Sequence, residues 1–232
     1  MMNNHVRSIF GVGAALLLCA SARAVVTFSD TEFVNSNWGS ETVALGAGGT
    51  STGTQTTGGN PGFGREVTNN LIIGGTIYAL HRYGTTAATR YDPPISGAIS
   101  AVDFSIDSKW FSGIGGLGHG ITIGAKQGTV VFRAGFDVTG STGLWETHAA
   151  SGFTAPDFFA VNGSATLIDF SATGAPIRFG FVVSNGAVNE SYTNVVLYDN
   201  FRVVVHNVPS PGVPAVLGLG GLAAFARRRR PL

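Results

Sequence analysis

Short runs of alternating apolar and polar residues recur along the middle of the chain. Val102, Phe104 and Ile106 alternate with Asp103, Ser105 and Asp107. A period of two is typical of a β-strand with one packed face and one wet face. Strands are predicted on this basis at residues 25–28, 71–73, 77–81, 98–106, 121–125, 130–134, 177–183 and 195–205.

The last of these runs predicts a long, central strand that closes the fold. Its apolar face is predicted to hold Val195, Leu197, Phe201, Val203 and Val205, with Asp199 as the one polar member of that row. The opposite face is predicted to hold Tyr198, Asn200 and Arg202.

Glycine, asparagine and proline separate the strands. Residues 46–59 form a low-complexity run of Gly, Thr and Ser, which predicts a surface loop. Residues 58–62, with Asn60-Pro61 between glycines, predict a turn, and Asn185-Gly186 predicts another.

These patterns favour an all-β fold, an antiparallel β-sandwich of the jelly-roll type, in one domain over residues 25–207. The composition agrees, because 34 glycines and only 12% charged residues are atypical of a helical protein. A signal helix before this domain and a hydrophobic helix after it are predicted to flank the sandwich.

The first 24 residues have the three parts of a secretory signal. Arg7 lies in a polar start, an apolar run follows at residues 9–20, and Ala22 and Ala24 form an A-x-A cleavage site. We therefore expect export and cleavage after Ala24. Cys19, the sole cysteine, would be lost with the signal, or would be acylated if the signal were that of a lipoprotein.

The predicted domain carries a negative net charge. Without residues 1–24 and 209–232, 14 − 6 = 8 basic residues remain against 13 acidic ones, a net charge of −5. Nucleic acids and anionic membranes require clustered Lys and Arg. We therefore expect no nucleic-acid partner for the domain.

Two sequence patterns suggest enzyme sites. Residues 113–118 match G-x-G-x-x-G, and Asp137 follows at about the distance of a ribose-binding acid, but the next residues predict a strand where a nucleotide fold needs a helix. A glycine-rich loop is favoured. Asp103 and Asp107 would share a strand face as a glycosidase pair does, although a solvated sheet face explains them equally well.

The remaining polar and aromatic candidates are dispersed along the sequence. Four histidines, at positions 81, 119, 148 and 206, lack the spacing of metal ligands, so surface or hydrogen-bonded core positions are expected. Aromatic side chains that could stack on sugars are Trp38, Trp110, Trp145, Tyr83 and Tyr91.

Asp199 lies in the run Y-D-N-F-R-V, which resembles the closing strand of carbohydrate-binding, lectin-like and laminin-G-like sandwiches. In some of these a late Asp helps to hold a structural calcium ion. The resemblance implies a calcium site at Asp199 with Asp30 or Glu32, and no other cofactor is expected. The alternative is an Asp that caps a turn or pairs with Arg202.

The C-terminal residues 208–230 consist of a proline-rich hinge, an apolar run and four arginines, Arg227, Arg228, Arg229 and Arg230. The apolar run at 213–226 would span about 21 Å as a helix, less than the roughly 30 Å core of a bilayer. The arginines are expected to stay on the cytoplasmic side.

This tail resembles the PEP-CTERM sorting signal of exported bacterial proteins. Pro209, Ser210 and Pro211 occupy the motif position, with Ser210 where that family has Glu. The resemblance implies transient insertion in the inner membrane, processing by an exosortase-like enzyme near the motif, and a final place at the cell surface or outside the cell.

Three functions remain open on this sequence. The first is an exported, non-catalytic sandwich protein of the surface or matrix that binds extracellular polysaccharide. The second is an extracellular glycan-active enzyme on a similar sandwich, and the third is a surface protein whose membrane tail stays uncut.

Overall fold

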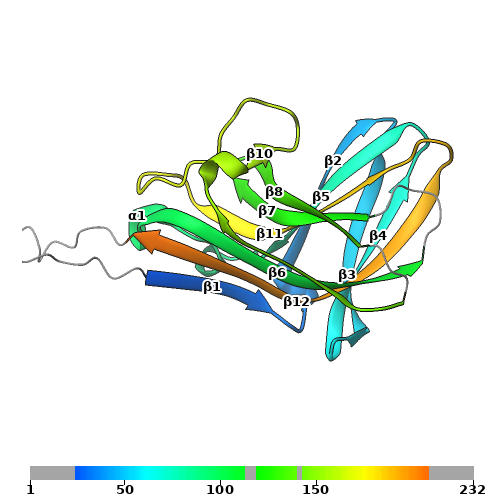
Figure 1. Cartoon of the computed structure of the whole chain (residues 1–232), viewed down its shortest axis with the longest axis horizontal. Coiled ribbons are helices and arrows are strands. Elements are labelled where there is room, and N and C mark those ends of the chain that lie inside the picture. Colours follow the sequence, from blue (N-terminus) through cyan, green and yellow to red (C-terminus); the bar gives the residue numbers. More distant parts are fainter. Residues whose placement is uncertain (1–23, 113–118, 140–142, 209–232) are drawn as a thin grey trace, which may run out of the picture.

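The computed structural model describes residues 24–112, 119–139 and 143–208. They form two six-stranded antiparallel sheets that face each other, as the alternating pattern predicts (Figure 1). The signal residues 1–23, the G-x-G-x-x-G run at 113–118 and the tail from Pro209 through Ser210 and Pro211 to Arg227–Arg230 lie outside the described residues.

Sheet A has the order β3-β4-β12-β6-β9, and β1 also pairs with β12. Its strands are β1 (Ala24–Asp30), β3 (Gly49–Gly59), β4 (Gly62–Leu71), β6 (Ala98–Ser112), β9 (Glu146–Phe153) and β12 (Tyr192–Val208). One edge of β12 pairs with β4 over its first half and with β1 over its second half, while the other edge pairs with β6.

Sheet B has the order β10-β8-β7-β11-β5-β2. Its strands are β2 (Trp38–Gly46), β5 (Gly75–Tyr83), β7 (His119–Gln127), β8 (Val130–Thr139), β10 (Phe159–Ala160) and β11 (Ile177–Gly186). The described helices are short: η1 (Asn35–Asn37), η2 (Ala87–Thr89), α1 (Pro93–Ser96) and η3 (Ala155–Asp157).

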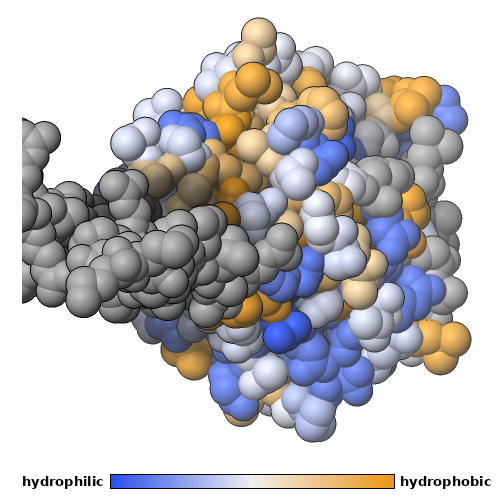
Figure 2. All heavy atoms as spheres, turned by 60° about the vertical axis from the view of Figure 1, so that its left-hand side comes forward, coloured by the Kyte–Doolittle hydropathy of each residue, from blue (hydrophilic) through white to orange (hydrophobic). Residues whose placement is uncertain are grey.

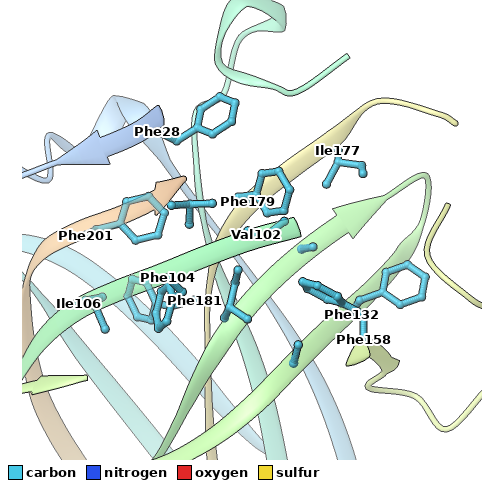
Figure 3. Packing of buried hydrophobic residues seen from close by; sticks show 14 of the residues in the cluster. Phe28, Val102, Phe104, Ile106, Phe132, Phe158, Ile177, Phe179, Phe181 and Phe201 are labelled. Carbon is cyan, nitrogen blue, oxygen red and sulfur yellow. The ribbon is translucent and has the colours of Figure 1, made fainter. Parts of the chain in front are cut away.

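Phenylalanines fill much of the space between the sheets (Figure 3). Phe28 of β1 lies 5.9 Å from Phe179 of β11, measured between ring centroids, and Trp38 of β2 lies 5.1 Å from Phe201 of β12. Each pair joins one sheet to the other. Burial of such rings supplies most of the free energy that holds two sheets together.

The outer surface mixes hydrophilic and hydrophobic residues on the side that Figure 2 shows. Across the described ranges, no helix has both the length and the apolarity that a membrane crossing requires.

The prediction of a loop at residues 46–59 is wrong. Residues 49–59 form β3, whose backbone pairs with β4 from Gly49↔Leu71 to Gly59↔Gly62. The predicted turn at 58–62 is confirmed as the β3–β4 hairpin. β3 lies at the edge of sheet A and is mostly exposed, so main-chain pairing forms it without an apolar face.

The turn predicted at Asn185-Gly186 is also wrong, because β11 continues to Gly186 in register with Thr76 of β5. Asn185 is buried, so its side chain belongs to the interior of the sandwich.

The faces predicted for β12 are wrong in its first half. Tyr198 is fully buried together with Val196, and the inward row continues at Phe201, Val203 and Val205. The register against β6 shifts between Asp199 and Arg202, where Asn200 has φ 52°. This bulge adds a residue and exchanges the two faces, which strict alternation cannot anticipate.

We predict that Gly53→Ala destabilises the protein by about 1–3 kcal/mol, as overpacking of a core does. A Cβ at Gly53 would lie 2.6 Å from Nε of the buried Arg65. Urea unfolding would measure the change, with the exposed edge-strand variant Thr57→Ala as the matched control. Equal stability of the Gly53→Ala variant and the wild type would contradict this packing.

Candidate functional site

A cationic and polar cluster lies inside the sandwich near β2 and β5. The guanidinium of Arg65 donates to Nδ1 of His81 at 3.3 Å and to Oγ of Ser40 at 3.1 Å, and its Cζ lies 5.4 Å from the ring centroid of Trp38. Oγ of Ser51 lies 3.2 Å from Nε2 of His81. Burial lowers the pKa of Arg65 to about 10, while the charge of Asp30 opposes that change.

Three histidines that are far apart in sequence approach one another in this interior. Burial lowers the pKa of His81, and the charges of Arg65 and His119 lower it further. Burial lowers the pKa of His119 to about 3, against a hydrogen bond with Asn185, and the charge of His148 lowers it further. His119 also shares a hydrogen bond with the hydroxyl of Tyr198. The prediction of hydrogen-bonded core histidines is therefore confirmed at positions 81, 119 and 148.

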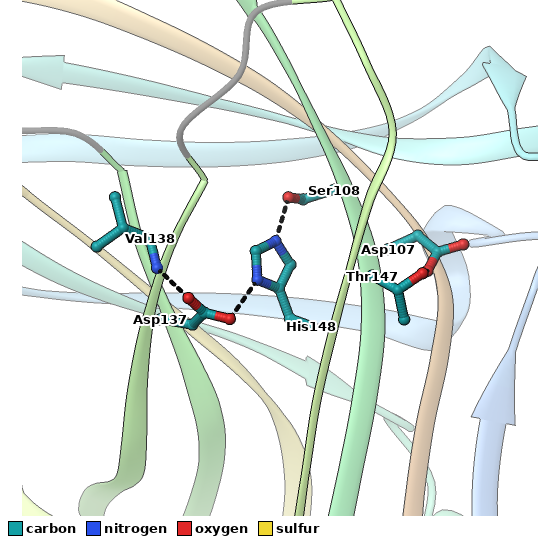
Figure 4. Close-up of polar contacts among 6 residues, drawn as sticks. All are labelled: Asp107, Ser108, Asp137, Val138, Thr147 and His148. Atoms are coloured by element: carbon teal, nitrogen blue, oxygen red, sulfur yellow. Dashed lines mark hydrogen bonds and ion pairs between the residues drawn. The ribbon is translucent and has the colours of Figure 1, made fainter.

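Ser108, His148 and Asp137 have the contacts of a catalytic triad (Figure 4). Oγ of Ser108 lies 2.7 Å from Nε2 of His148, and Nδ1 of His148 lies 2.8 Å from Oδ2 of Asp137. The backbone N–H of Val138 donates to Oδ1 of Asp137 at 2.8 Å. These residues come from β6, β9 and β8, and the sequence gives no sign that they meet.

In this triad the acid is exposed to solvent and the hydroxyl that would act as nucleophile is buried. The side chain of Asp137 is 62% exposed, whereas Ser108 is fully buried. A pocket of about 100 Å³ at the opening between the sheets is lined by Asp137 and His148 but not by Ser108. A hydrolase requires its nucleophile to reach the substrate. In this geometry the triad links the two sheets.

Asp199 is fully buried at the β12 bulge. Its carboxylate accepts hydrogen bonds from the backbone N–H of Asn60 and, at 2.6 Å, from that of Asn200. The side chain of Asn200 donates to Asp107 at 2.8 Å, and that of Asn60 donates to Asp107 at 3.1 Å. Asp199 thus fixes the bulge to the β3–β4 hairpin. Sequence reasoning did not place Asn60 or Asp107 beside it.

Asp30, which the sequence suggests as a calcium partner of Asp199, accepts hydrogen bonds from other groups. Oδ1 of Asp30 accepts from the backbone N–H groups of Glu32 and Phe33, and Oδ2 accepts from the indole of Trp38 at 2.8 Å. Burial raises the pKa of Asp199, and the charges of Asp107 and Glu32 raise it further, against two backbone hydrogen bonds. In the described ranges no three His, Cys, Asp or Glu side chains group as metal ligands. The carboxylates are satisfied within the chain, and calcium at Asp199 stays a prediction.

The pair proposed for glycosidase chemistry is already engaged. Asp103 accepts from the backbone N–H of Gly152 and lies 2.7 Å from Nε2 of His206. Asp107 accepts from Thr147 at 2.7 Å as well as from the two asparagines. A general acid of a glycosidase needs a raised pKa. Burial raises the pKa of Asp103, but hydrogen bonds from His206 and Gly152 outweigh it, so the net change is downward.

Two of the aromatic candidates for sugar stacking are buried. Trp38 stacks on Phe33 inside the core, and the hydroxyl of Tyr91 donates to the carbonyl of Gly97 at 2.9 Å. Tyr83, Trp110 and Trp145 are partly exposed, and Nζ of Lys109 lies 6.0 Å from the ring centroid of Trp145.

Side chains reach across the outer face of sheet B, which we call the concave face because a pocket opens on it. Lys126 of β7 forms an ion pair with Glu41 of β2, although β11 and β5 lie between those strands. Arg133 of β8 likewise lies over Tyr78 of β5, 5.2 Å from the ring centroid, across β7 and β11. Three strand spacings amount to about 14 Å, so these side chains must lean toward each other across the two intervening strands.

A pocket of about 540 Å³ opens on this side of the molecule, within the size range of ligand sites. It is lined by Arg82, Thr85, Arg90, Lys126, Gly128, Ala175, Pro176 and Arg178. The guanidinium of Arg178 donates to the carbonyl of Gly84 at 2.6 Å. The lining therefore offers many N–H donors. Sequence reasoning missed this site because its residues come from three strands and from the segments that connect them.

The fold and its sites define an antiparallel two-sheet β-sandwich with a polar cluster inside its hydrophobic core and a pocket on one outer face. No protein-family model matches the sequence, and no curated protein matches it.

A comparison with solved structures found several that are similar to this chain. The family 11 carbohydrate-binding module of the cellulosomal cellulase Lic26A-Cel5E of Clostridium thermocellum is 14% identical, with a TM-score of 0.45, over 78% of this chain and 95% of that one. The CBM22-1–GH10 modules of xylanase 10B from the same organism are 12% identical, with a TM-score of 0.41, over 76% of this chain and 28% of that one. An exo-β-agarase is 13% identical, with a TM-score of 0.37, over 79% and 26%.

We predict that the free energy of unfolding decreases as the pH falls from about 7 to about 5. His81 and His119 stay neutral in the folded protein because their pKa values are lowered, whereas the unfolded chain takes up protons below the ordinary pKa of about 6.5. Each such histidine adds a slope of up to about 1.4 kcal/mol per pH unit.

Urea unfolding at several pH values would measure this slope, and His119→Gln should remove one histidine's share of it. A His119→Gln variant with the slope of the wild type would contradict the burial of a neutral imidazole at this position.

Proposed function

We propose that this protein is an exported, non-catalytic polysaccharide-binding protein that uses the concave outer face of sheet B. The observation that supports this most directly is the pocket on this face, which is lined by N–H donors from three strands and their connecting segments. Sugars are recognised by convergent hydrogen-bonding groups, and the pocket lining supplies such groups.

The absence of catalysis is part of the proposal. The Asp103 and Asp107 carboxylates lie on sheet A, away from the concave face of sheet B, and both already accept hydrogen bonds. The buried Ser108 cannot meet a polymeric substrate in this geometry. The functional alternative, a glycan-active enzyme, would need two free acids on the concave face, where Glu41 is paired with Lys126 and Asp92 is paired with Arg90.

Binding of the full-length protein to an array of bacterial and plant polysaccharides tests this function. We expect retention on at least one polysaccharide, with no release of reducing sugar over hours. Release of reducing ends would identify an enzyme instead, and retention on no glycan would contradict the proposal.

We further propose that the N-terminal signal directs export and that the tail is a sorting signal, removed at the membrane by an exosortase-like enzyme. The support is the order of motif, apolar run and arginine cluster at residues 208–230. Mass spectrometry of the surface form should find a C-terminus near Pro209–Pro211, without Arg227–Arg230. A surface form that ends at Leu232 would favour the uncut membrane anchor.

A further inference from the structure

Half of the basic residues of the domain line one pocket. Residues 25–208 contain eight Lys and Arg residues, and four of them, Arg82, Arg90, Lys126 and Arg178, border the hollow of sheet B. None of the eight lining residues is an acid. The domain as a whole has a net charge of −5, so the positive charge at this pocket is opposite in sign to that of the rest of the domain.

Carboxylates compensate only part of this charge. Lys126 is paired with Glu41, and Nη2 of Arg90 lies 3.4 Å from Oδ2 of Asp92. In the described part of the chain, no ion pair joins Arg82 or Arg178 to an acid. Four cations and two partner carboxylates leave 4 − 2 = 2 positive charges.

These guanidinium groups also lie close enough to affect one another. Burial lowers the pKa of Arg178, and the charges of Arg82 and Arg90 lower it further. Nε of Arg82 is buried and has no hydrogen-bond partner among the described residues. An oxyanion in the pocket would relieve the repulsion and accept from these donors, because guanidinium N–H groups match the oxygens of carboxylate and sulfate.

The backbone holds Arg82 in this position. Arg82 pairs with Gly39 on one neighbouring strand and with Gly180 on the other. A Cβ at Gly39 would lie 2.9 Å from Cζ of Arg82, so the guanidinium lies over the space that the glycine leaves free. A methyl group at Gly39 would therefore displace the guanidinium of Arg82 without any change in charge.

We propose that this pocket binds the oxyanion groups of an acidic polysaccharide, with Arg82 and Arg178 as the main anion contacts. The proposal rests on the proposed function, because it names the class of glycan for the same concave face. The shared chemistry is a carboxylate or sulfate group repeated along a sugar chain.

Affinity electrophoresis of the full-length protein tests the proposal with polygalacturonate, its fully methyl-esterified form, a sulfated galactan and double-stranded DNA. We expect retention by polygalacturonate or the sulfated galactan, and which of them binds distinguishes carboxylate from sulfate. Retention should weaken as NaCl rises from about 50 to about 500 mM. The methyl ester keeps the same backbone without the charge and should be retained much less.

Three variants locate the contact. Arg82→Gln should weaken binding about tenfold or more, since it removes a charge-assisted hydrogen bond. Gly39→Ala should weaken binding with every charge kept. Arg202→Gln makes the same change of charge on sheet A and should bind as the wild type does. Melting temperatures of the variants separate loss of binding from loss of fold.

The outcomes separate the two proposals. Equal retention by polygalacturonate and its methyl ester, or unchanged binding of acidic glycan by Arg82→Gln, would overturn the anion site and leave polysaccharide binding intact. Equal retention by DNA would overturn the assignment to a glycan. Binding to none of the polysaccharides, including a wider neutral set, would overturn the proposed function itself.

Discussion

The sandwich depends on the hydrogen bonding of β12 along both of its edges. One edge pairs with β6 throughout, while the other pairs with β4 and then with β1. The change of partner falls at the bulge of Asp199 and Asn200, where a single buried carboxylate accepts two backbone N–H groups. A buried carboxylate that lost these donors would cost several kcal/mol. The N-terminal strand and the β3–β4 hairpin therefore both depend on this point.

The sequence predicts the fold class well because the apolar rows of β6, β11 and most of β12 follow the period of a half-buried strand. The prediction from this period fails at the edge strand β3 and at the bulge in β12. β3 has no apolar row because it is an edge strand held by main-chain bonds, and the bulge in β12 exchanges the faces on either side of Asn200. A single positive φ at a non-glycine residue leaves no trace in a hydropathy pattern.

The candidate sites were less predictable than the fold. Their residues are brought together by strand order and register, which local patterns do not determine. His81, His119 and His148 all lie in the interior although they are dispersed in the sequence. Arg82, Lys126 and Arg178 likewise line one pocket although they belong to different strands. Overall charge was a misleading guide, because a domain of net charge −5 can still gather half of its cations in one pocket.

The composition of β3 has a consequence for how copies of this protein behave at high density. An unpaired strand edge invites hydrogen bonding with a second chain, and long apolar edges begin fibres. β3 presents the run G-T-S-T-G-T-Q-T-T-G-G at one edge of sheet A. With small polar side chains on its outer face, a second copy that paired there would bury little apolar surface. Copies of this protein can in this way be crowded together and remain separate molecules.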